Sequence, residues 1–268
     1  MAINLAGTSA GIDFSGAPRV ALPDSLPAPA GVFYLGGDAE KSCMNRASLK
    51  AAAGAVVGTP TFAQNYATLT GNQVAAINTL LAELDAITIA VVGRAKSANV
   101  TATADRPVFA GTFGSDPTQN IASAFGLMFG TNGVPSGQAA PHASAGMLSY
   151  SVTGNTTPPT PASNGWPTPD VPDLTTWRLL IASRTPGVEV RTWDKTANTS
   201  AAVSLVGKTS LLNLTRRILL GSDYGGTRLG SCDEAAVYIF PASFTSPMTD
   251  TLAAFSRAAI GARGVSGF

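Results

Sequence analysis

The chain has 268 residues, of which 45% are hydrophobic and only 12% are charged, and its formal net charge is +1. This length suits one large domain or two small ones, and so apolar a chain is not expected to be disordered. The near-zero charge argues against nucleic acid or an anionic membrane as a partner. One histidine and two cysteines argue against a zinc site.

The N-terminal residues show no sign of a secretory signal, because they lack both a basic region and a long apolar region. The longest apolar stretches, such as residues 87–92, are far shorter than the ~20 residues that a membrane-spanning helix needs. We therefore expect a protein that is made in a cytoplasm and stays soluble. Cys43 and Cys232 are expected to be reduced, buried thiols, with a long-range disulfide as the alternative.

Residues 1–54 differ in composition from the rest of the chain. Residues 31–37 form an apolar run closed by glycines, which predicts a short strand, and residues 48–53 predict a single helical turn. Prolines exclude a helix of useful length before them: Pro18, Pro23, Pro27 and Pro29. We interpret residues 1–54 as an extended arm that packs on something larger. A peripheral flap of the same domain is an equal alternative.

From residue 55 the chain reads as short strands separated by turn residues. Residues 65–70 and 73–78 flank Gly71 and Asn72, a pair typical of a tight hairpin. Residues 79–85 are predicted to be helical, because three leucines fall on one side of a helix there. Residues 87–94 are rich in β-branched side chains and predict a buried central strand.

Further strands and one helix complete the pattern. The helix is predicted at residues 247–259, whose apolar side chains could pack on a sheet. Many short strands with few helices predict an all-β antiparallel β-sandwich, which we assign to residues 55–268. The further predicted strands are residues 108–113, 124–130, 146–153, 177–183, 187–193, 201–206, 216–221 and 235–240.

The longest break in this pattern is residues 154–172, which contain six prolines around Trp166. Such a density of proline predicts a stiff, extended segment that forms neither a helix nor a sheet ladder. Long loops inside compact domains are often functional. A simple crossing between two sheets would have the same composition, so both interpretations stay open.

A series of short motifs resembles the concanavalin A-like, laminin G-type jelly roll over residues 55–262. In that family a tryptophan opens one strand, a hairpin follows, and a Gly-x-x-Asp-Glu strand precedes the final helix. The resemblance implies a jelly-roll fold, here with short helices and an extended N-terminal arm. The motifs lie at residues 60–66, 69–71, 87–94, 177–181, 187–194, 218–221 and 230–238.

The low charge, the absence of a visible signal and the proline-rich arm extend this resemblance to jelly-roll modules of tailed-bacteriophage virions. That resemblance implies a fibre, spike, appendage or shell-decorating protein that contacts other virion proteins through residues 1–54 and forms a homo-oligomer. A surface of small neutral residues loses little side-chain entropy when it is buried in an assembly. Coding bias toward alanine and glycine explains the same composition equally well.

Some polar and aromatic residues are expected to serve the fold. Trp177, Trp193 and Tyr238 are expected to be aromatic residues of the sheet core. Asp233 and Glu234 lie between a glycine turn and an apolar strand, where we expect them to accept hydrogen bonds from backbone amides.

Enzymatic activity is not expected. Glycosidases of this fold use a Glu-x-Asp-x-Glu strand, whereas here Glu83-Leu84-Asp85 lacks the third carboxylate and is predicted to be a solvated helix end. His142 lies in a predicted loop, and the chain has no Gly-x-Ser-x-Gly elbow that would supply a nucleophile. We expect no catalytic residues and no cofactor.

Carbohydrate binding is the chemistry that the sequence favours most. Aromatic faces bind the C–H surface of sugars, and amides and carboxylates bind the hydroxyls. Trp166, Asn164 and Asp170 offer these groups in the long loop, and Asp223 and Tyr224 offer them after the strand at residues 216–221. Aromatic residues on loops also anchor protein interfaces, which is the alternative.

Taken with the virion resemblance, the sequence implies a non-enzymatic phage virion protein: a tail-associated fibre, spike or receptor-binding appendage with a lectin-like jelly roll that could contact host surface glycans. Nucleic-acid binding and membrane insertion are not expected. No metal site is predicted, although calcium at loop carboxylates such as Asp223 and Asp233 stays open. The first alternative is a capsid decoration protein without a ligand, and the second is a glycan-cleaving enzyme.

Overall fold

The structure is a computed structural model that describes residues 20–48, 50–97, 103–114, 125–132, 144–149, 162–165, 173–208, 212 and 215–268. Its elements in chain order are β1 (Gly31–Tyr34), α1 (Ala39–Cys43), β2 (Ala55–Gly58), β3 (Thr61–Phe62), β4 (Ala67–Thr70), β5 (Ala75–Ala82), β6 (Ile87–Ala95), the 3-10 turn η1 (Thr103–Asp105), β7 (Val108–Gly111), β8 (Gly126–Asn132), β9 (Ser144–Ser149), β10 (Ala162–Gly165), β11 (Arg178–Thr185), β12 (Glu189–Asp194), β13 (Thr199–Ser204), β14 (Arg217–Leu220), β15 (Ser231–Phe240) and α2 (Ser246–Gly261).

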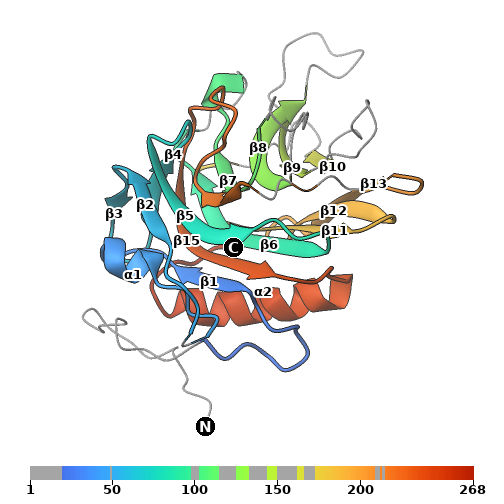
Figure 1. Ribbon diagram of the computed structural model, residues 1–268, viewed down its shortest axis with the longest axis horizontal. Helices are drawn as coiled ribbons and strands as arrows, with labels where there is room; N and C mark the ends of the chain where they lie inside the picture. The colour runs from blue at the N-terminus through green and yellow to red at the C-terminus, as the bar shows by residue number, and fades with distance from the viewer. Residues whose placement is uncertain are drawn as a thin grey trace.

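The strands form an antiparallel sheet that folds over into two layers, which confirms the predicted all-β sandwich. One layer contains β10-β9-β8-β7-β14-β5-β2, and the other contains β3-β4-β15-β6-β11-β12-β13 with β1 beside β15. Thr70 and Ala75, at the corner between β4 and β5, form the pair that joins the layers. Figure 1 shows β8 and β9 on one side of the molecule and α2 running beneath β1 and β15 on the other.

The central strand β6 explains why its sequence is continuously apolar. Ile87, Ile89 and Val91 point between the two layers and belong to the main core. Ala90 and Val92 point to the opposite face, where they join the second apolar cluster together with residues of α2. A strand that is covered on both faces needs apolar residues at every position rather than at alternate ones.

The predicted C-terminal helix is confirmed as α2, and it lies on the outer face of the second layer. Leu252, Ala253 and Ile260 are buried against this face. Just after the helix, the Arg263 guanidinium donates to the carbonyls of Ala235, at 3.0 Å, and Leu35, at 2.8 Å. Burial lowers the pKa of Arg263 to about 10. These contacts fix the end of α2 to the sheet.

The N-terminal region is packed into the sandwich wherever the structure describes it. β1 pairs with β15 from Gly31 to Tyr34, as the predicted strand requires, and Phe33 is fully buried. The predicted helical turn at residues 48–53 is wrong: the helix is α1, where Asp38 accepts a hydrogen bond from the Lys41 amide at 2.8 Å. A capping carboxylate decides where this short helix starts.

The predicted helix at residues 79–85 is also wrong, because residues 79–82 continue β5 and residues 83–85 are not helical. A bulge opposite β14 interrupts the strand register, and Leu80 adopts a φ of 61° with its side chain 47% exposed. The Thr79 hydroxyl donates to the Ile218 carbonyl at 2.8 Å within the bulge. A bulge shifts the alternation of a strand, so its leucines imitate helical spacing.

Other strand predictions are confirmed with small shifts of their ends, and two need correction. The predicted hairpin between β4 and β5 exists, but its turn spans residues 71–74, with Asn72 and Gln73 both at positive φ. In the proline-rich segment 154–172, β10 pairs with β9, so the expectation that no ladder forms there is wrong for these four residues. They contain no proline. The remainder of that segment lies outside the described residues.

Candidate functional site

The end of β6, the start of β15 and η1 enclose a cleft of about 310 Å³. This volume is at the lower end of the ~300–1,000 Å³ range of small-molecule sites. Its lining mixes charged, hydroxyl and apolar groups: Ala95, Lys96, Ser97, Ala104, Asp105, Leu229, Gly230 and Ser231.

The walls of the cleft are held together by backbone contacts. The Leu229 amide donates to the Ala104 carbonyl at 2.7 Å, and the Lys96 amide donates to the Ser231 carbonyl at 3.0 Å. Gly230 lies so close to η1 that an added Cβ would be 2.3 Å from the Asp105 carbonyl oxygen. Glycine is therefore required for the loop before β15 to approach η1.

Asp233 organises the charges beside this cleft. Its buried carboxylate accepts hydrogen bonds from Arg94 Nε, at 2.9 Å, and from the Thr68 hydroxyl, at 2.7 Å, and Lys96 Nζ lies 3.7 Å away. We expected Asp233 to accept from backbone amides, which is wrong. β15 pairs with β4 on one side and with β6 on the other here, so ladder bonds occupy the local amides.

Two aromatic rings hold Arg94 in place. Its guanidinium carbon lies 4.7 Å from the ring centroid of Trp177 and 5.5 Å from that of Tyr66, and the two rings meet edge to face at 5.6 Å. Both rings are half-buried and pack against the second apolar cluster, so Trp177 lies at the rim of the predicted core rather than inside it. Trp193 and Tyr238 are buried as predicted.

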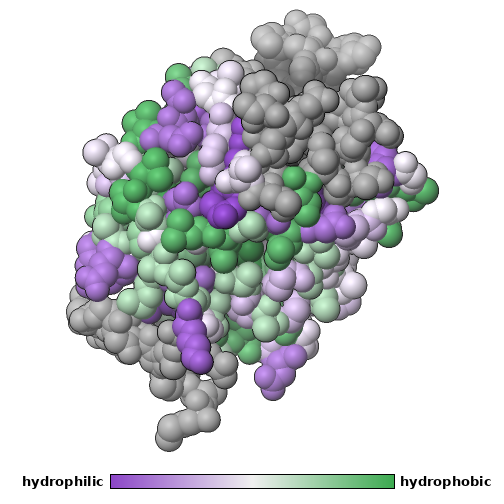
Figure 2. All heavy atoms as spheres, in the orientation of Figure 1, coloured by the Kyte–Doolittle hydropathy of each residue, from purple (hydrophilic) through white to green (hydrophobic). Residues whose placement is uncertain are grey.

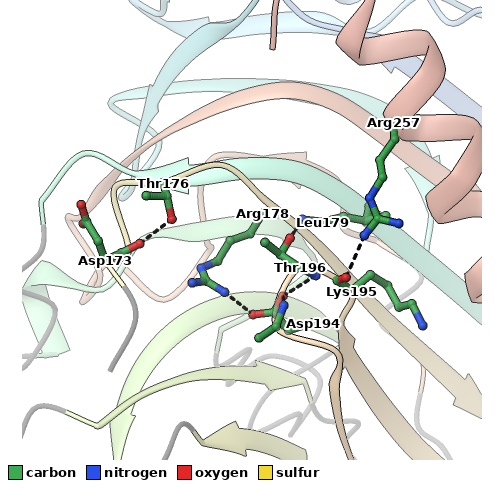
Figure 3. A network of polar contacts seen from close by, with 9 residues as sticks. Asp173, Thr176, Arg178, Leu179, Asp194, Lys195, Thr196 and Arg257 are labelled. Atoms are coloured by element: carbon green, nitrogen blue, oxygen red, sulfur yellow. Dashed lines mark hydrogen bonds and ion pairs between the residues drawn. The ribbon is translucent and has the colours of Figure 1, made fainter. Parts of the chain in front are cut away.

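A polar network joins the start of β11 to the turn between β12 and β13 (Figure 3). Arg178, which follows Trp177 in the chain, forms a buried ion pair with Asp194 at 2.7 Å. The Thr196 amide donates to the same Asp194 at 2.9 Å, and Arg257 of α2 donates to the Lys195 carbonyl at 2.9 Å. The turn between β12 and β13 is thereby fixed to α2 and to the start of β11.

Glu234 and Cys232 lie on β15, just beyond the cleft residue Ser231, and both are fully buried. Burial raises the pKa of Glu234 well above its usual range, an effect that the Cys232 thiol and the Gly221 amide oppose. The Gly221 amide donates to the Phe109 carbonyl at 2.7 Å, so acceptance from backbone amides by Glu234 stays a prediction. The Cys232 thiol lies 3.4 Å from Glu234 Oε1, and burial raises its pKa well above the usual value. Cys43 and Cys232 are free and buried, which confirms the thiol prediction.

Replacing Glu234 by glutamine is expected to flatten part of the pH dependence of stability. Below the ordinary glutamate pKa, the folded and unfolded chains both hold this proton. Above it, the unfolded chain releases the proton while the folded chain retains it, so stability falls with rising pH until the raised folded pKa is passed. We expect urea unfolding from pH 4 to 8 to show that the free energy of unfolding of Glu234→Gln rises, relative to the wild type, by up to ~1.4 kcal/mol per pH unit. A constant difference across this range would contradict the buried neutral carboxyl.

Glu83, the glycosidase candidate, is buried, so the prediction of a solvated helix end is wrong. Its Oε1 lies 2.7 Å from Arg184 Nη1, and the Thr112 hydroxyl donates to its Oε2 at 2.6 Å. Arg184 has no exposed surface. Asp85, the other carboxylate of the motif, is exposed. Because Glu83, just after β5, is buried in the interior, this carboxylate stabilises the fold and is not presented to a substrate.

The predicted carbohydrate-binding residues lie in two places, of which the loop between β14 and β15 is fully described. Asp223 is buried there, 3.5 Å from Arg228, and burial raises the pKa of its carboxyl, an effect that Arg228 opposes. The Tyr224 hydroxyl donates to the Arg217 carbonyl at 2.9 Å, and the Arg216 guanidinium lies 4.7 Å from its ring centroid. The polar groups of both residues thus hold this loop.

The second place is the proline-rich segment. Asn164 is in β10, where it pairs with Met147 of β9. Trp166 and Asp170 lie outside the described residues, as does His142. A sugar-binding role for the five residues remains a prediction. Sequence reasoning missed the cleft, since its lining comes from three separate segments. The signal nearest to it was the Gly-x-x-Asp-Glu motif, which begins at Gly230 of the lining and was interpreted only as a fold motif.

No group of three or more His, Cys, Asp or Glu side chains that could hold a metal ion occurs in the described part of the chain. Asp223 and Asp233, the two carboxylates considered for calcium, each face an arginine instead. Among the described helices, none is long and apolar enough to cross a membrane.

Comparison with known proteins supports the fold. The chain is similar to the ligand-binding domain of botulinum neurotoxin serotype D, solved with N-acetylneuraminic acid, at a TM-score of 0.52 and 9% identity, covering 86% of this chain and 52% of that one. The receptor-binding domain of the mosaic serotype C/D matches at 0.53 and 10%, over 86% and 52%. The binding domain of Paraclostridial Mosquitocidal Protein 1 matches at 0.53 and 9%, over 84% and 52%.

These likenesses identify the class of fold: the chain is an antiparallel jelly-roll β-sandwich of the kind that these toxin binding domains contain. It spans about half the length of the solved chains that it matches. The part that they share need not contain the ligand site of a whole toxin domain. No protein-family model and no curated protein matches the sequence.

Proposed function

We propose that this protein is a non-enzymatic binding module of a phage virion, a tail-associated appendage whose jelly roll contacts host surface glycans. The single observation that carries the proposal is the polar cleft beside the Arg94–Trp177–Tyr66 stack, at one end of a jelly roll. Solved binding domains of toxins share this fold. Hydroxyl, amine and carboxylate groups around an apolar wall are the groups that recognise saccharides.

The virion setting is supported by composition. In the view of Figure 2, purple hydrophilic groups are separate patches among pale and green residues, as expected when 12% of residues are charged. Such a surface loses little side-chain entropy on burial in an assembly. The N-terminal arm, residues 1–54, is proposed to contact neighbouring virion proteins, and the subunits to form a homo-oligomer. A capsid decoration protein without a ligand is the alternative.

Filling the cleft tests the binding function. Ala104 lines the cleft and is exposed, so Ala104→Trp should block it without disturbing the core. We expect the purified protein to adsorb to host cells, and Ala104→Trp to reduce adsorption at least tenfold. Ala52→Trp, at an exposed position that does not line the cleft, is the matched control and should behave as the wild type.

The outcomes of this assay separate the competing sites and functions. If Trp166→Ala or Tyr224→Ala abolishes adsorption while Ala104→Trp does not, the glycan site lies in the predicted loops instead of the cleft. If no variant changes adsorption, or if the wild-type protein does not adsorb at all, the binding function is contradicted and the decoration role is favoured. Immunolabelling of intact particles then decides between head and tail.

A further inference from the structure

Two groups of charged residues stand beside the cleft. In the first, Arg94 and Lys96 share the carboxylate of Asp233, at 2.9 Å and 3.7 Å. Two cations around one carboxylate leave one positive charge in excess. Lys96 is the more loosely held of the two, and its side chain is 46% exposed on the cleft wall.

The second group lies on the loops that form the opposite wall. Arg228, next to Leu229 of the cleft, lies 3.5 Å from Asp223 and 3.9 Å from the ring centroid of Phe113. Arg106 follows Asp105 of the cleft. Burial and the nearby guanidinium of Arg228 lower the pKa of Arg106. In this group Arg228 pairs with Asp223, and Arg106 is a second cation.

Asp105 and Lys96 are the charged residues of the cleft lining. Lys96 shares Asp233 with Arg94, so these three described residues leave one positive charge in excess at the cleft wall. An excess positive charge on a cleft wall attracts an anion. Asp105, however, is an exposed carboxylate inside the cleft, which repels a bare anion and accepts hydrogen bonds from hydroxyls.

We propose that the cleft binds a saccharide that carries a carboxylate, with Lys96 pairing with the ligand's carboxylate and Asp105 accepting from its hydroxyls. This inference rests on the proposed glycan-binding function and names the ligand class for the same site. Ser97 and Ser231 supply further hydroxyl partners, and Leu229, 48% exposed, supplies an apolar contact. When the ligand's carboxylate pairs with Lys96, Asp233 keeps its ion pair with Arg94.

Calorimetric titration with a matched pair of sugars tests the carboxylate preference. Trigalacturonic acid and galactotriose differ in having a carboxylate or a hydroxymethyl group on each ring. At 20 mM salt we expect the acidic sugar to bind at least tenfold more tightly, and at 500 mM salt this preference should shrink, because salt screens exposed charges. Lys96→Gln should lower the affinity for the acidic sugar at least fivefold and change the affinity for the neutral sugar by less than twofold. Lys50→Gln, an exposed lysine elsewhere, is the control.

Asp105→Asn distinguishes a saccharide from a bare anion. If hydroxyls bind to Asp105, the variant should weaken trigalacturonate binding, whereas it should strengthen binding of an anion that Asp105 only repels. Stronger binding in Asp105→Asn, or tighter binding of an oligonucleotide than of either sugar, would overturn the inference. If the two sugars bind with equal affinity and Ala104→Trp still blocks adsorption, the carboxylate preference alone is overturned. If Ala104→Trp does not reduce adsorption, the proposed function is overturned as well.

Discussion

Replacing Glu83 by glutamine is expected to destabilise the protein by about 3–5 kcal/mol, because the change leaves the Arg184 guanidinium buried without its counter-charge. The loss is large relative to the ~5–15 kcal/mol of total stability that domains usually have. Urea unfolding followed by circular dichroism measures it. Asp85→Asn, two residues away and exposed, is the matched control and should change stability by less than ~0.5 kcal/mol.

The double variant Glu83→Leu, Arg184→Met provides the second half of this test. Removing both charges leaves no unpaired ion, so it should be more stable than Glu83→Gln. A Glu83→Gln protein of wild-type stability would contradict the buried pair. If that variant also lost a measurable release of reducing ends from host polysaccharide, the enzyme alternative would have to be reinstated.

Deleting residues 1–40 is expected to abolish cooperative folding, whereas deleting residues 1–18 is not. The longer deletion removes β1, whose Phe33 is fully buried between the layers and whose backbone pairs with β15. Truncating one buried phenylalanine to alanine typically costs ~3–5 kcal/mol, and a whole strand costs more. Thermal unfolding of both deletions measures the difference, and Phe33→Ala tests the same packing with a single change.

The two deletions also separate folding from attachment. The proposed contact with virion neighbours predicts that the 1–18 deletion folds normally but is missing from particles. Normal incorporation of this deletion contradicts the attachment role. A folded 1–40 deletion would instead show that the N-terminal region is a peripheral flap.

The arrangement of strands could be predicted because it depends on local chemistry. Residues 87–94 are β-branched and apolar, and residues 247–259 are amphipathic, so β6 and α2 followed from composition and period. The helix predicted at residues 79–85 failed because Leu80 lies in a bulge, which is set by pairing with β14, a strand far away in sequence. Non-local pairing of this kind leaves no local signal.

The site could not be predicted in the same way. Lys96, Asp105 and Ser231 come from three segments, and only the fold brings them together. Asp223 has the residue type of a sugar ligand, yet it is buried beside Arg228. Burial and ion pairing depend on tertiary structure, so residue type alone cannot distinguish a binding carboxylate from one that holds a loop.

The most direct test of the account is a crystal structure of the protein with the oligosaccharide that binds best on a glycan array. The account predicts the sugar in the cleft, with Lys96 and Asp105 in hydrogen-bonding distance and the jelly roll unchanged. A sugar bound at Trp166 or Tyr224 with the cleft empty would contradict it.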